Sequence, residues 1–362
     1  MTGRLAALAG LERIVIQEYE LPSVAPGAAL LKVRRANVCG SDLHIFHHLS
    51  IALRDIALGH EFVAEVAELG AGLTADSAGS PLAVGDRIAV VYFHTCRRCP
   101  ACDNGEFNIC HNANESLALR PEVYPHFHGA FASHFYLDPG QYFYKVPDSL
   151  TDAEAAGANC GLAQVMFALD SIGLRRGQVV VVQGAGGLGL YACAVAASSG
   201  ARVIVVEQQR DRLELARQFG ATDALDLSQC TDSHERTARV LETTGGLGAD
   251  IVLEVTGQAG AFSQAIDFAR IGGHIASVGN INVGPSFEIP IMPAILTRKN
   301  LRVHGYLRYD PWYLRRALDF MADNSSHYPF GSLSDRTYSL DQIGEAFARA
   351  EERRVARVAI IP

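Results

Sequence analysis

The first 150 residues carry short apolar runs that alternate with glycine, proline and polar residues. Three of these runs span residues 29–33, 62–66 and 87–91. Each run has the length of a strand, and the Gly85-Asp86 pair before the third run is typical of a turn. The pattern predicts an all-β opening domain.

From about residue 178 the pattern changes to apolar strands that alternate with amphipathic helices. We predict helices that start near residues 188 and 211, and strands over residues 179–182, 203–206, 251–255 and 274–278. Such alternation predicts βαβ units and a doubly wound parallel sheet, which is an α/β fold. Residues 177–201 lack charged side chains over the length of a membrane span, but their glycines favour a strand, a turn and a helix.

The last part of the chain, from about residue 296, returns to mixed short elements. We predict a strand over 301–306, a helix over 312–321 and a strand over 357–361. A chain of 362 residues exceeds what one hydrophobic core usually organises. We therefore expect two tightly joined domains: a β-rich domain from residues 1–160 and 296–362, and an α/β domain from residues 161–295 inserted into it.

The composition indicates a globular protein with a small-molecule partner. Hydrophobic residues make up 49% of the chain and charged residues 19%, which excludes a disordered chain. The formal net charge of −8 argues against nucleic acid or an anionic membrane as partner, because both need clustered Lys and Arg. The N-terminal apolar run is too short for a signal peptide, so we expect a cytoplasmic protein without a membrane anchor.

Four of the eight cysteines lie within the short segment 95–111, at positions Cys96, Cys99, Cys102 and Cys110. In a reducing compartment, such clustering indicates metal rather than disulfides. Four thiolates with two-residue gaps can wrap one tetrahedral Zn²⁺, and a closed shell of this kind is structural. A redox Cys-x-x-Cys pair would instead place two cysteines at the start of a helix. We predict a structural zinc site in this loop.

A second set of candidate ligands is dispersed along the chain. It consists of Cys39, His60 and Cys160, which would form a Cys₂His shell with the fourth position open to water or substrate. A lone cysteine or histidine is more often an ordinary core residue. From the residues alone, two interpretations therefore stay open: a catalytic zinc site, or ordinary core residues.

A glycine-rich segment follows the apolar strand at 179–182 and opens a predicted helix. Its residues are Gly184, Gly186, Gly187, Leu188 and Gly189. Glycines allow the backbone to approach a pyrophosphate at a helix N-terminus, where unpaired N–H groups favour an anion. Glu207 follows 18 residues after Gly189, where a carboxylate can bind ribose hydroxyls and repel a 2′-phosphate. The segment predicts a dinucleotide site with NAD rather than NADP.

With these motifs in this order, the chain resembles the zinc-containing medium-chain dehydrogenases, the superfamily of alcohol and polyol dehydrogenases. The resemblance implies a GroES-like β-rich catalytic domain and a Rossmann domain. It also implies two zinc ions per chain, one in the four-cysteine loop and one at Cys39, His60 and Cys160. A homodimer or homotetramer is the usual assembly in this family.

The resemblance further assigns roles around the catalytic zinc and the cofactor. Glu61 stands where the family has a glutamate that binds the metal transiently, and Asp42 where a carboxylate orients the ligand histidine. Ser41 and His44 occupy the proton-relay positions, and Arg212 the position of a basic residue at the adenosine ribose. The implied reaction is oxidation of an alcohol activated by zinc, with hydride transfer to NAD.

Cys160 favours the alcohol branch, because the polyol branch usually has glutamate there. Short stretches also resemble a bacterial subgroup that includes dehydrogenases of hydroxylated terpenoids such as hydroxycamphor. With the aromatic residues Phe46, Tyr92, Phe93 and Trp312, this leads us to expect a bulky, apolar secondary alcohol that is oxidised to its ketone.

Three alternatives stay open. The histidines His47, His48, His94, His126 and His128 could serve a polar or anionic substrate, as in a polyol dehydrogenase. A zinc-free reductase of the same superfamily would lack the candidate ligands, which are present here. A non-catalytic binding protein descended from such an enzyme would show loss of a ligand or relay residue, and none is lost.

Overall fold

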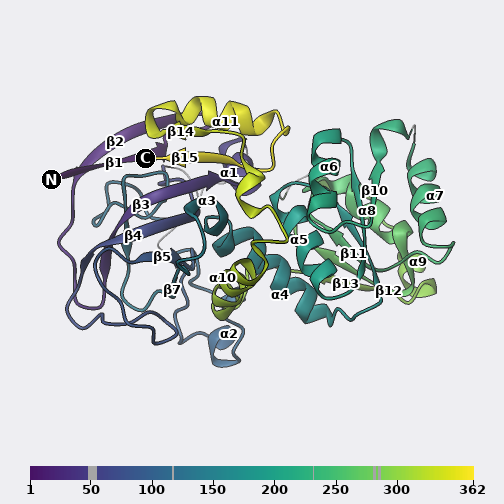
Figure 1. Cartoon of the computed structure of the whole chain (residues 1–362), viewed down its shortest axis with the longest axis horizontal. Helices are drawn as coiled ribbons and strands as arrows, with labels where there is room; N and C mark the ends of the chain where they lie inside the picture. The colour runs from purple at the N-terminus through teal and green to yellow at the C-terminus, as the bar shows by residue number, and fades with distance from the viewer. Residues whose placement is uncertain (48–54, 116–117, 231, 280–282, 284–286) are drawn as a thin grey trace. The chain divides into compact units, whose positions relative to one another are not determined.

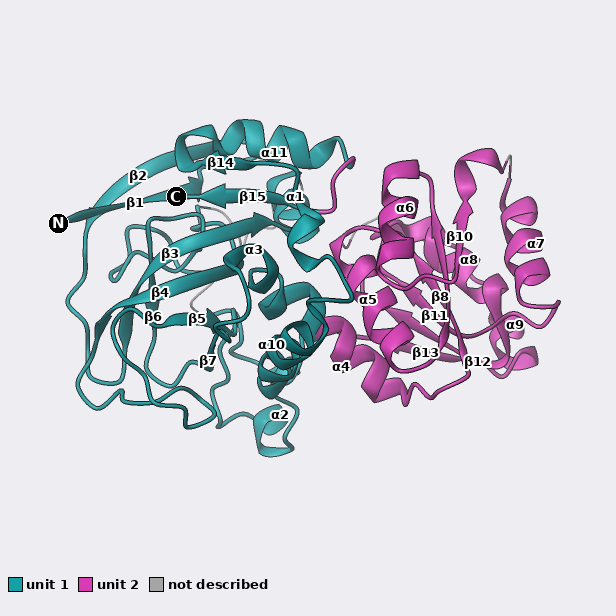
Figure 2. Ribbon diagram, viewed as in Figure 1, with its two compact units in different colours: residues 1–163, 308–353, 357–362 teal, residues 164–307, 354–356 magenta. Residues whose placement is uncertain are grey.

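A computed structural model describes residues 1–47, 55–115, 118–230, 232–279, 283 and 287–362 of the chain. His48, one of the histidines considered above, lies outside the described residues. The chain divides into two compact units (Figures 1 and 2). Unit 1 comprises residues 1–163, 308–353 and 357–362, and unit 2 comprises residues 164–307 and 354–356.

Unit 1 is built around a mostly antiparallel sheet with the order β14-β15-β3-β4-β5-β7, to which β6 adds by pairing with β3. A separate hairpin pairs β1 with β2. The strands are β1 (Thr2–Leu8), β2 (Ile14–Glu20), β3 (Ala29–Val38), β4 (Glu61–Leu69), β5 (Arg87–Val90), β6 (His134–Leu137), β7 (Phe143–Lys145), β14 (Thr337–Ser339) and β15 (Val358–Ile361). The three apolar runs predicted as strands in this part of the chain correspond to β3, β4 and β5.

Short helices join these strands, so the opening part of the chain is not purely β as we predicted. The helices of unit 1 are α1 (Gly40–His47), α2 (Pro100–Asp103), α3 (Asp152–Ala155), α10 (Trp312–Asn324) and α11 (Ile343–Glu351). The missed helix that bears on function is α1, because it carries Ser41, Asp42 and His44. Asp42, in its first turn, accepts the N–H of Cys39 and so satisfies a donor that helix formation leaves free.

Unit 2 contains a six-stranded sheet in which every neighbouring pair is parallel, with the order β10-β9-β8-β11-β12-β13. This order confirms the predicted doubly wound α/β fold. The strands are β8 (Val179–Gln183), β9 (Arg202–Glu207), β10 (Asp223–Asp226), β11 (Ala249–Glu254), β12 (Ala269–Ser277) and β13 (Arg302–Gly305). The central strands β8, β9 and β11 are buried along most of their length, which explains their continuous apolar sequences.

Helices lie on both sides of this sheet (Figure 2). They are α4 (Ala163–Ile172), α5 (Gly187–Ser198), α6 (Arg210–Gln218), α7 (Ser233–Thr243), α8 (Ala259–Phe268) and α9 (Pro293–Arg298). The uncharged segment 177–201 forms β8, a glycine turn and α5, as predicted. Among the described residues, no helix combines the length and the apolar character needed to cross a membrane.

The second boundary differs from the expected one. We placed residues 296–307 in the β-rich domain, but β13 pairs with β12 as the sixth strand of the parallel sheet. Residues up to Leu307 therefore belong to unit 2, and the chain re-enters unit 1 at Arg308. A strand of four residues carries no sequence signal that tells which sheet it joins, which is why the pattern did not resolve this point.

Candidate metal and cofactor sites

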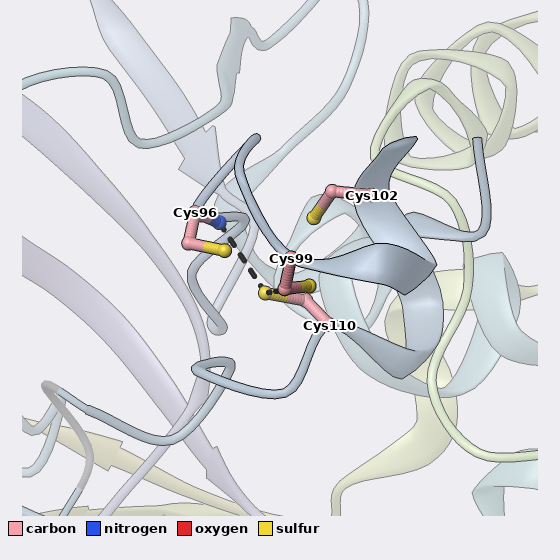
Figure 3. A group of neighbouring side chains, drawn as sticks. All are labelled: Cys96, Cys99, Cys102 and Cys110. Carbon is pink, nitrogen blue, oxygen red and sulfur yellow. Dashed lines mark hydrogen bonds between the residues drawn. The ribbon is translucent and has the colours of Figure 1, made fainter. Parts of the chain in front are cut away.

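The four cysteines of the loop 95–111 come together as predicted. One ligand atom from each of Cys96, Cys99, Cys102 and Cys110 lies within 4.8 Å of the others, and Figure 3 shows the sulfur atoms pointing toward one another. The Sγ atoms of Cys99 and Cys110 are 4.0 Å apart, and the N–H of Cys96 donates to Cys110 Sγ at 3.3 Å. Helix α2 begins with Pro100 directly after Cys99, which turns the chain so that Cys102 faces the cluster.

The electrostatics of this loop differ between its cysteines. Backbone N–H groups of Cys102 and His111 lower the pKa of Cys99 to about 6. Burial raises the pKa of Cys102 to about 12, and a cation bound beside this sulfur would lower it. A closed set of four sulfur donors without an open position fits a structural zinc ion.

The three dispersed candidate ligands also meet, although they come from distant parts of the chain. Ligand atoms of Cys39, His60 and Cys160 lie within 4.8 Å of one another. The two Sγ atoms are 3.9 Å apart, and Cys160 Sγ is 3.5 Å from Nε2 of His60. Cys39 follows β3 and His60 precedes β4, so the pairing of these strands brings both residues to one end of the sheet.

The position of His60 depends on a glycine and on helix α1. Gly59 has φ +92°, and a Cβ atom there would lie 2.6 Å from the backbone nitrogen of Phe131, so only glycine fits. Nδ1 of His60 lies 3.2 Å from Oδ1 of Asp42, which leaves Nε2 facing the cysteines. The hydroxyl of Ser41 is 3.2 Å from this Nε2. A carboxylate on one nitrogen and a metal on the other is the usual arrangement for a zinc-binding histidine.

Cys160 is held by a turn that the sequence did not predict. It lies in the fully buried π-helical turn η3 (Ala158–Leu162), and such turns are rare and concentrate at functional sites. The side chain of Asn159 donates to the backbone carbonyls of His60 and Val90, both at 2.9 Å, and accepts the N–H of Phe62 at 3.3 Å. Asn159 thus ties the cysteine segment to the histidine segment, and a lone Asn in an apolar run gave no signal of this role.

Glu61 is fully buried beside this cluster. Its Oε1 accepts from Arg357 at 2.8 Å and from Asn37 at 2.9 Å, whereas Oε2 has no hydrogen-bond partner among the described residues. Burial raises the pKa of Glu61, and the nearby Arg357 opposes this shift. A buried carboxylate oxygen without a partner is available to a cation, so the donor set here fits zinc with one further position open. Sequence reasoning missed Asn37 and Arg357.

The four aromatic candidates differ in what their rings contact. The Tyr92 ring lies 5.1 Å from the His60 ring, and burial raises the pKa of the Tyr92 phenol. Phe46 instead packs against Phe347, and Trp312 against Phe107. Phe93 is 1% exposed and belongs to the core. Of these four aromatic residues, Tyr92 is therefore the one whose ring lies beside a candidate ligand in the part of the chain that the structure describes.

The candidate histidines mostly have partners of their own. His47 bonds the carboxylates of Glu12 and Glu351, His94 bonds Asp138, and His126 stacks on Tyr19. His128 is buried, and burial lowers its pKa. His44 is half-buried on α1, three residues after Ser41. The contacts of His47, His94 and His126 weaken the case for a polar substrate held by histidines.

The glycine-rich segment forms a tight turn into α5. Gly186 is the N-cap residue of α5, and Gly187, Leu188 and Gly189 form its first turn. A Cβ atom on Gly189 would lie 1.9 Å from the carbonyl oxygen of Gly184, so the helix can approach the strand only with glycine here. The first N–H groups of α5 follow this glycine turn, and a helix N-terminus of this kind is suited to a dinucleotide pyrophosphate.

Glu207, at the end of β9, faces this turn. Its Oε2 accepts the N–H of Ala185 at 2.9 Å, and its Oε1 accepts the N–H groups of Gln208 and Gln209 at 2.7 and 3.2 Å. Arg212 lies close by, with Nη1 3.9 Å from Glu207 and Nη2 donating to the carbonyl of Val355 at 2.7 Å. The charge of Arg212 is therefore paired with a carboxylate.

Comparison with protein families matches both parts of the chain. Residues 25–148 match the alcohol dehydrogenase GroES-like domain, and residues 187–323 match the zinc-binding dehydrogenase domain. The chain is 32% identical to 5-exo-hydroxycamphor dehydrogenase of Pseudomonas putida, covering 95% of this chain and 94% of that protein. It is also 32% identical to D-xylulose reductase A of Aspergillus oryzae, covering 87% and 85% of the two chains.

Solved structures of dehydrogenases have the same fold as this chain. An alcohol dehydrogenase from Thermotoga maritima superposes with a TM-score of 0.91 at 28% identity, and the alignment covers 100% of both chains. The 2R,3R-butanediol dehydrogenase from Bacillus subtilis gives a TM-score of 0.82 at 25% identity, covering 99% of both chains.

Proposed function

Because the chain belongs to the zinc-containing medium-chain dehydrogenases, a superfamily of alcohol dehydrogenases, we propose that it oxidises a secondary alcohol to a ketone with zinc and NAD. The observation that carries this proposal is the convergence of Cys39, His60 and Cys160, whose ligand atoms lie within 4.8 Å of one another. Three sulfur and nitrogen donors with an open fourth position are the arrangement of a catalytic zinc site.

Zinc would supply the Lewis acid that lowers the pKa of the substrate hydroxyl, and NAD would supply the hydride acceptor. The residues of the chain orient the zinc ligands and transfer the proton of the substrate hydroxyl. Asp42 fixes the orientation of His60 through the 3.2 Å contact to Nδ1. Ser41 lies beside Nε2 of His60, where it can take the hydroxyl proton, and His44 on the same helix can pass a proton to solvent.

For the cofactor we propose NAD, held at the first turn of α5 and by Glu207. The carboxylate of Glu207 would repel the 2′-phosphate of NADP, and the paired charge of Arg212 offers that phosphate little compensation. A kcat/KM with NADP that equals or exceeds that with NAD would contradict this assignment. The assembly stays a family-based expectation of a homodimer or homotetramer, which light scattering tests.

For the substrate we propose a bulky, mainly apolar and plausibly alicyclic alcohol. The ring of Tyr92 beside His60 supports an apolar wall, and the similarity to a hydroxycamphor dehydrogenase is in line with it. The similarity to a D-xylulose reductase favours the competing polyol class. A polyol would leave its additional hydroxyl groups without partners in an apolar pocket, which lowers the affinity for it.

The deciding experiment compares kcat/KM for cyclohexanol-like and terpenoid alcohols with that for sorbitol, threonine and hydroxyalkyl acids. We expect a clear preference for the first group, read by the absorbance of reduced nicotinamide. A preference for the polar group would overturn the substrate class alone. If chelation of zinc left every turnover unchanged, the zinc-dependent activity itself would be wrong, and if no turnover were found, a binding protein would be the better interpretation.

A further inference from the structure

A short segment of unit 1, Arg308–Trp312, contacts the four-cysteine loop at several points. We call it the linking segment. Oδ1 of Asp310 accepts the N–H groups of Phe107 and Asn108 at 3.1 and 3.3 Å, and both donors lie in the loop between Cys102 and Cys110. The Trp312 ring packs against the Phe107 ring with centroids 5.8 Å apart. One carboxylate and one indole therefore fix the part of the loop that approaches Cys110.

Arg308 strengthens this attachment. Its guanidinium donates to Oδ1 of Asn114 at 2.5 Å and to the backbone carbonyl of Asn108 at 3.4 Å. It also lies over the Phe93 ring, 5.5 Å from the ring centroid. Arg308 has φ +57°, a conformation that is uncommon for non-glycine residues and that these contacts stabilise here. The start of the linking segment is thus held firmly against the loop.

The middle of the linking segment reaches the other metal site. Tyr309 is fully buried, and its hydroxyl donates to the backbone carbonyl of Asn159, the residue before Cys160. Its ring packs edge-on against Phe93 and Tyr92, with centroids 5.4 and 6.2 Å away. The hydroxyl is thus hydrogen-bonded to the π-helical turn that carries Cys160. The side chain of the same Asn159 donates to the backbone carbonyl of His60.

From these contacts we propose that the linking segment couples the two metal sites, with Tyr309 and Asp310 as positioning residues for Cys160. Asp310 is hydrogen-bonded to the loop, and its chain neighbour Tyr309 is hydrogen-bonded to the turn η3. Because one peptide bond joins these two residues, a shift of the loop moves the turn η3 and with it the Cys160 sulfur. This inference rests on the proposed zinc sites. It adds that the structural site tunes the catalytic one rather than serving stability alone.

The test compares Tyr309→Phe and Asp310→Asn with matched controls in the same unit. Tyr309→Phe keeps the buried ring and removes only the hydroxyl, and Tyr136→Phe removes a buried hydroxyl that accepts the N–H of Ala25 instead. Asp76→Asn is the control for Asp310→Asn, since Asp76 also accepts loop N–H groups, those of Ala78 and Ser80. All four variants retain every candidate zinc ligand.

The main measurement is the rate at which zinc passes to a colorimetric chelator. The phase that is absent from Cys160→Ser is assigned to the Cys39, His60 and Cys160 site. We expect this phase to be about tenfold faster in Tyr309→Phe and Asp310→Asn, the size usual for losing a residue that orients a ligand. Tyr136→Phe and Asp76→Asn should match the wild type. Cobalt-substituted protein should show a shifted absorption band for the same site in the two linking-segment variants only.

Three outcomes are distinguishable. A faster phase in the linking-segment variants, with the controls unchanged, supports the coupling. A wild-type protein with both zinc phases, in which Tyr309→Phe and Asp310→Asn lower the melting temperature but leave the release rate and the cobalt spectrum unchanged, overturns the coupling and leaves the proposed function standing. A wild-type protein that lacks the Cys160-dependent phase overturns the catalytic zinc site and the coupling together.

Discussion

The two carboxylate oxygens of Asp42 serve two different metal-ligand candidates. Oδ1 lies 3.2 Å from Nδ1 of His60, and Oδ2 accepts the N–H of Cys39 at 2.8 Å. Burial alone would lower the pKa of His60, but the charge of Asp42 and its hydrogen bond raise that pKa well above its usual value. A single buried carboxylate therefore sets the orientation of His60 and fixes the backbone of Cys39.

Replacing this carboxylate should weaken the metal site without removing a ligand. We expect Asp42→Asn to lower zinc affinity at the catalytic site by about 10- to 100-fold, because the amide no longer polarises the imidazole. Competition with a chelator of known affinity measures this change. The control is Asp76→Asn, a buried aspartate that caps a loop elsewhere in unit 1. Equal zinc affinity in Asp42→Asn and the wild type would contradict the proposed role of Asp42.

The two cysteine sites should respond differently to mutation. Cys99→Ser opens a closed four-sulfur shell whose metal contributes folding free energy, so we expect a clearly lower melting temperature. Cys160→Ser removes a ligand from the open site, so we expect loss of most activity with a smaller change in stability. Elemental analysis of the folded wild type should give about two zinc ions per chain. One zinc ion or none would contradict the two-site assignment.

The parts of the fold and of the candidate sites that could be predicted from the sequence are those whose residues lie close together along the chain. The four-cysteine loop was recognisable because its ligands share one short segment, and the glycine turn because strand, glycines and helix follow one another. Cys39, His60 and Cys160 were weak candidates by themselves, since Cys39 and Cys160 are 121 positions apart and only strand pairing and the turn η3 bring them together. Their set was identified through a family resemblance.

The residues that hold these ligands were not predictable in the same way. Tyr309 and Asn159 are 150 positions apart, and Arg357 is 296 positions from Glu61. No periodicity or spacing marks such pairs, because each is defined only by the tertiary fold. The helix α1 was also missed: it is eight residues long and only weakly amphipathic, so its sequence reads as a loop.

The cofactor turn gives a steric prediction with a matched control. Gly189→Ala would place a Cβ atom 1.9 Å from the backbone oxygen of Gly184, so the turn must open and the first N–H groups of α5 must move. We expect KM for NAD to rise at least about tenfold, equivalent to about 1.4 kcal/mol of lost binding. Gly260→Ala is the control, because Gly260 lies in α8 and, apart from its chain neighbours and the backbone of its own helix, nothing lies within 4 Å of the added methyl group. It should leave KM unchanged, and a similar KM in both variants would contradict the assigned cofactor turn.

The charge at the end of β9 should decide between the two nicotinamide cofactors. Glu207→Ser removes the carboxylate that lies 3.9 Å from the guanidinium of Arg212. The repulsion of a 2′-phosphate is then lost, and the positive charge of Arg212 is retained. We expect the ratio of kcat/KM for NADP to that for NAD to rise by at least about tenfold. Glu214→Ser is the control, since Glu214 lies on the neighbouring helix α6 and pairs with Arg217. An unchanged cofactor ratio in Glu207→Ser would show that Glu207 does not discriminate between the cofactors.

A pH-dependent stability difference is expected at the end of α1. Nδ1 of His47 is 2.7 Å from Glu12, and Nε2 is 2.7 Å from Glu351. The hydrogen bond to Glu12 raises the pKa of His47, burial opposes this shift, and Glu351 adds to it. With both nitrogen atoms donating, the imidazole carries its full positive charge and joins α1 to α11 and to the turn between β1 and β2.

Because the folded-state pKa lies above the unfolded value of about 6.5, this contribution is fully present below about pH 6.5 and is lost as pH rises through the folded-state pKa. His47→Gln should therefore lower the melting temperature most near pH 6 and progressively less toward pH 9. The control is His327→Gln, an exposed histidine that bonds Ser326 rather than a carboxylate, and it should show no such trend. Since the side chain of His47 is about a third exposed, the maximum effect should be a few degrees at low salt and smaller at high salt. A deficit for His47→Gln that stays constant from pH 6 to pH 9 would show that His47 acts through packing rather than charge.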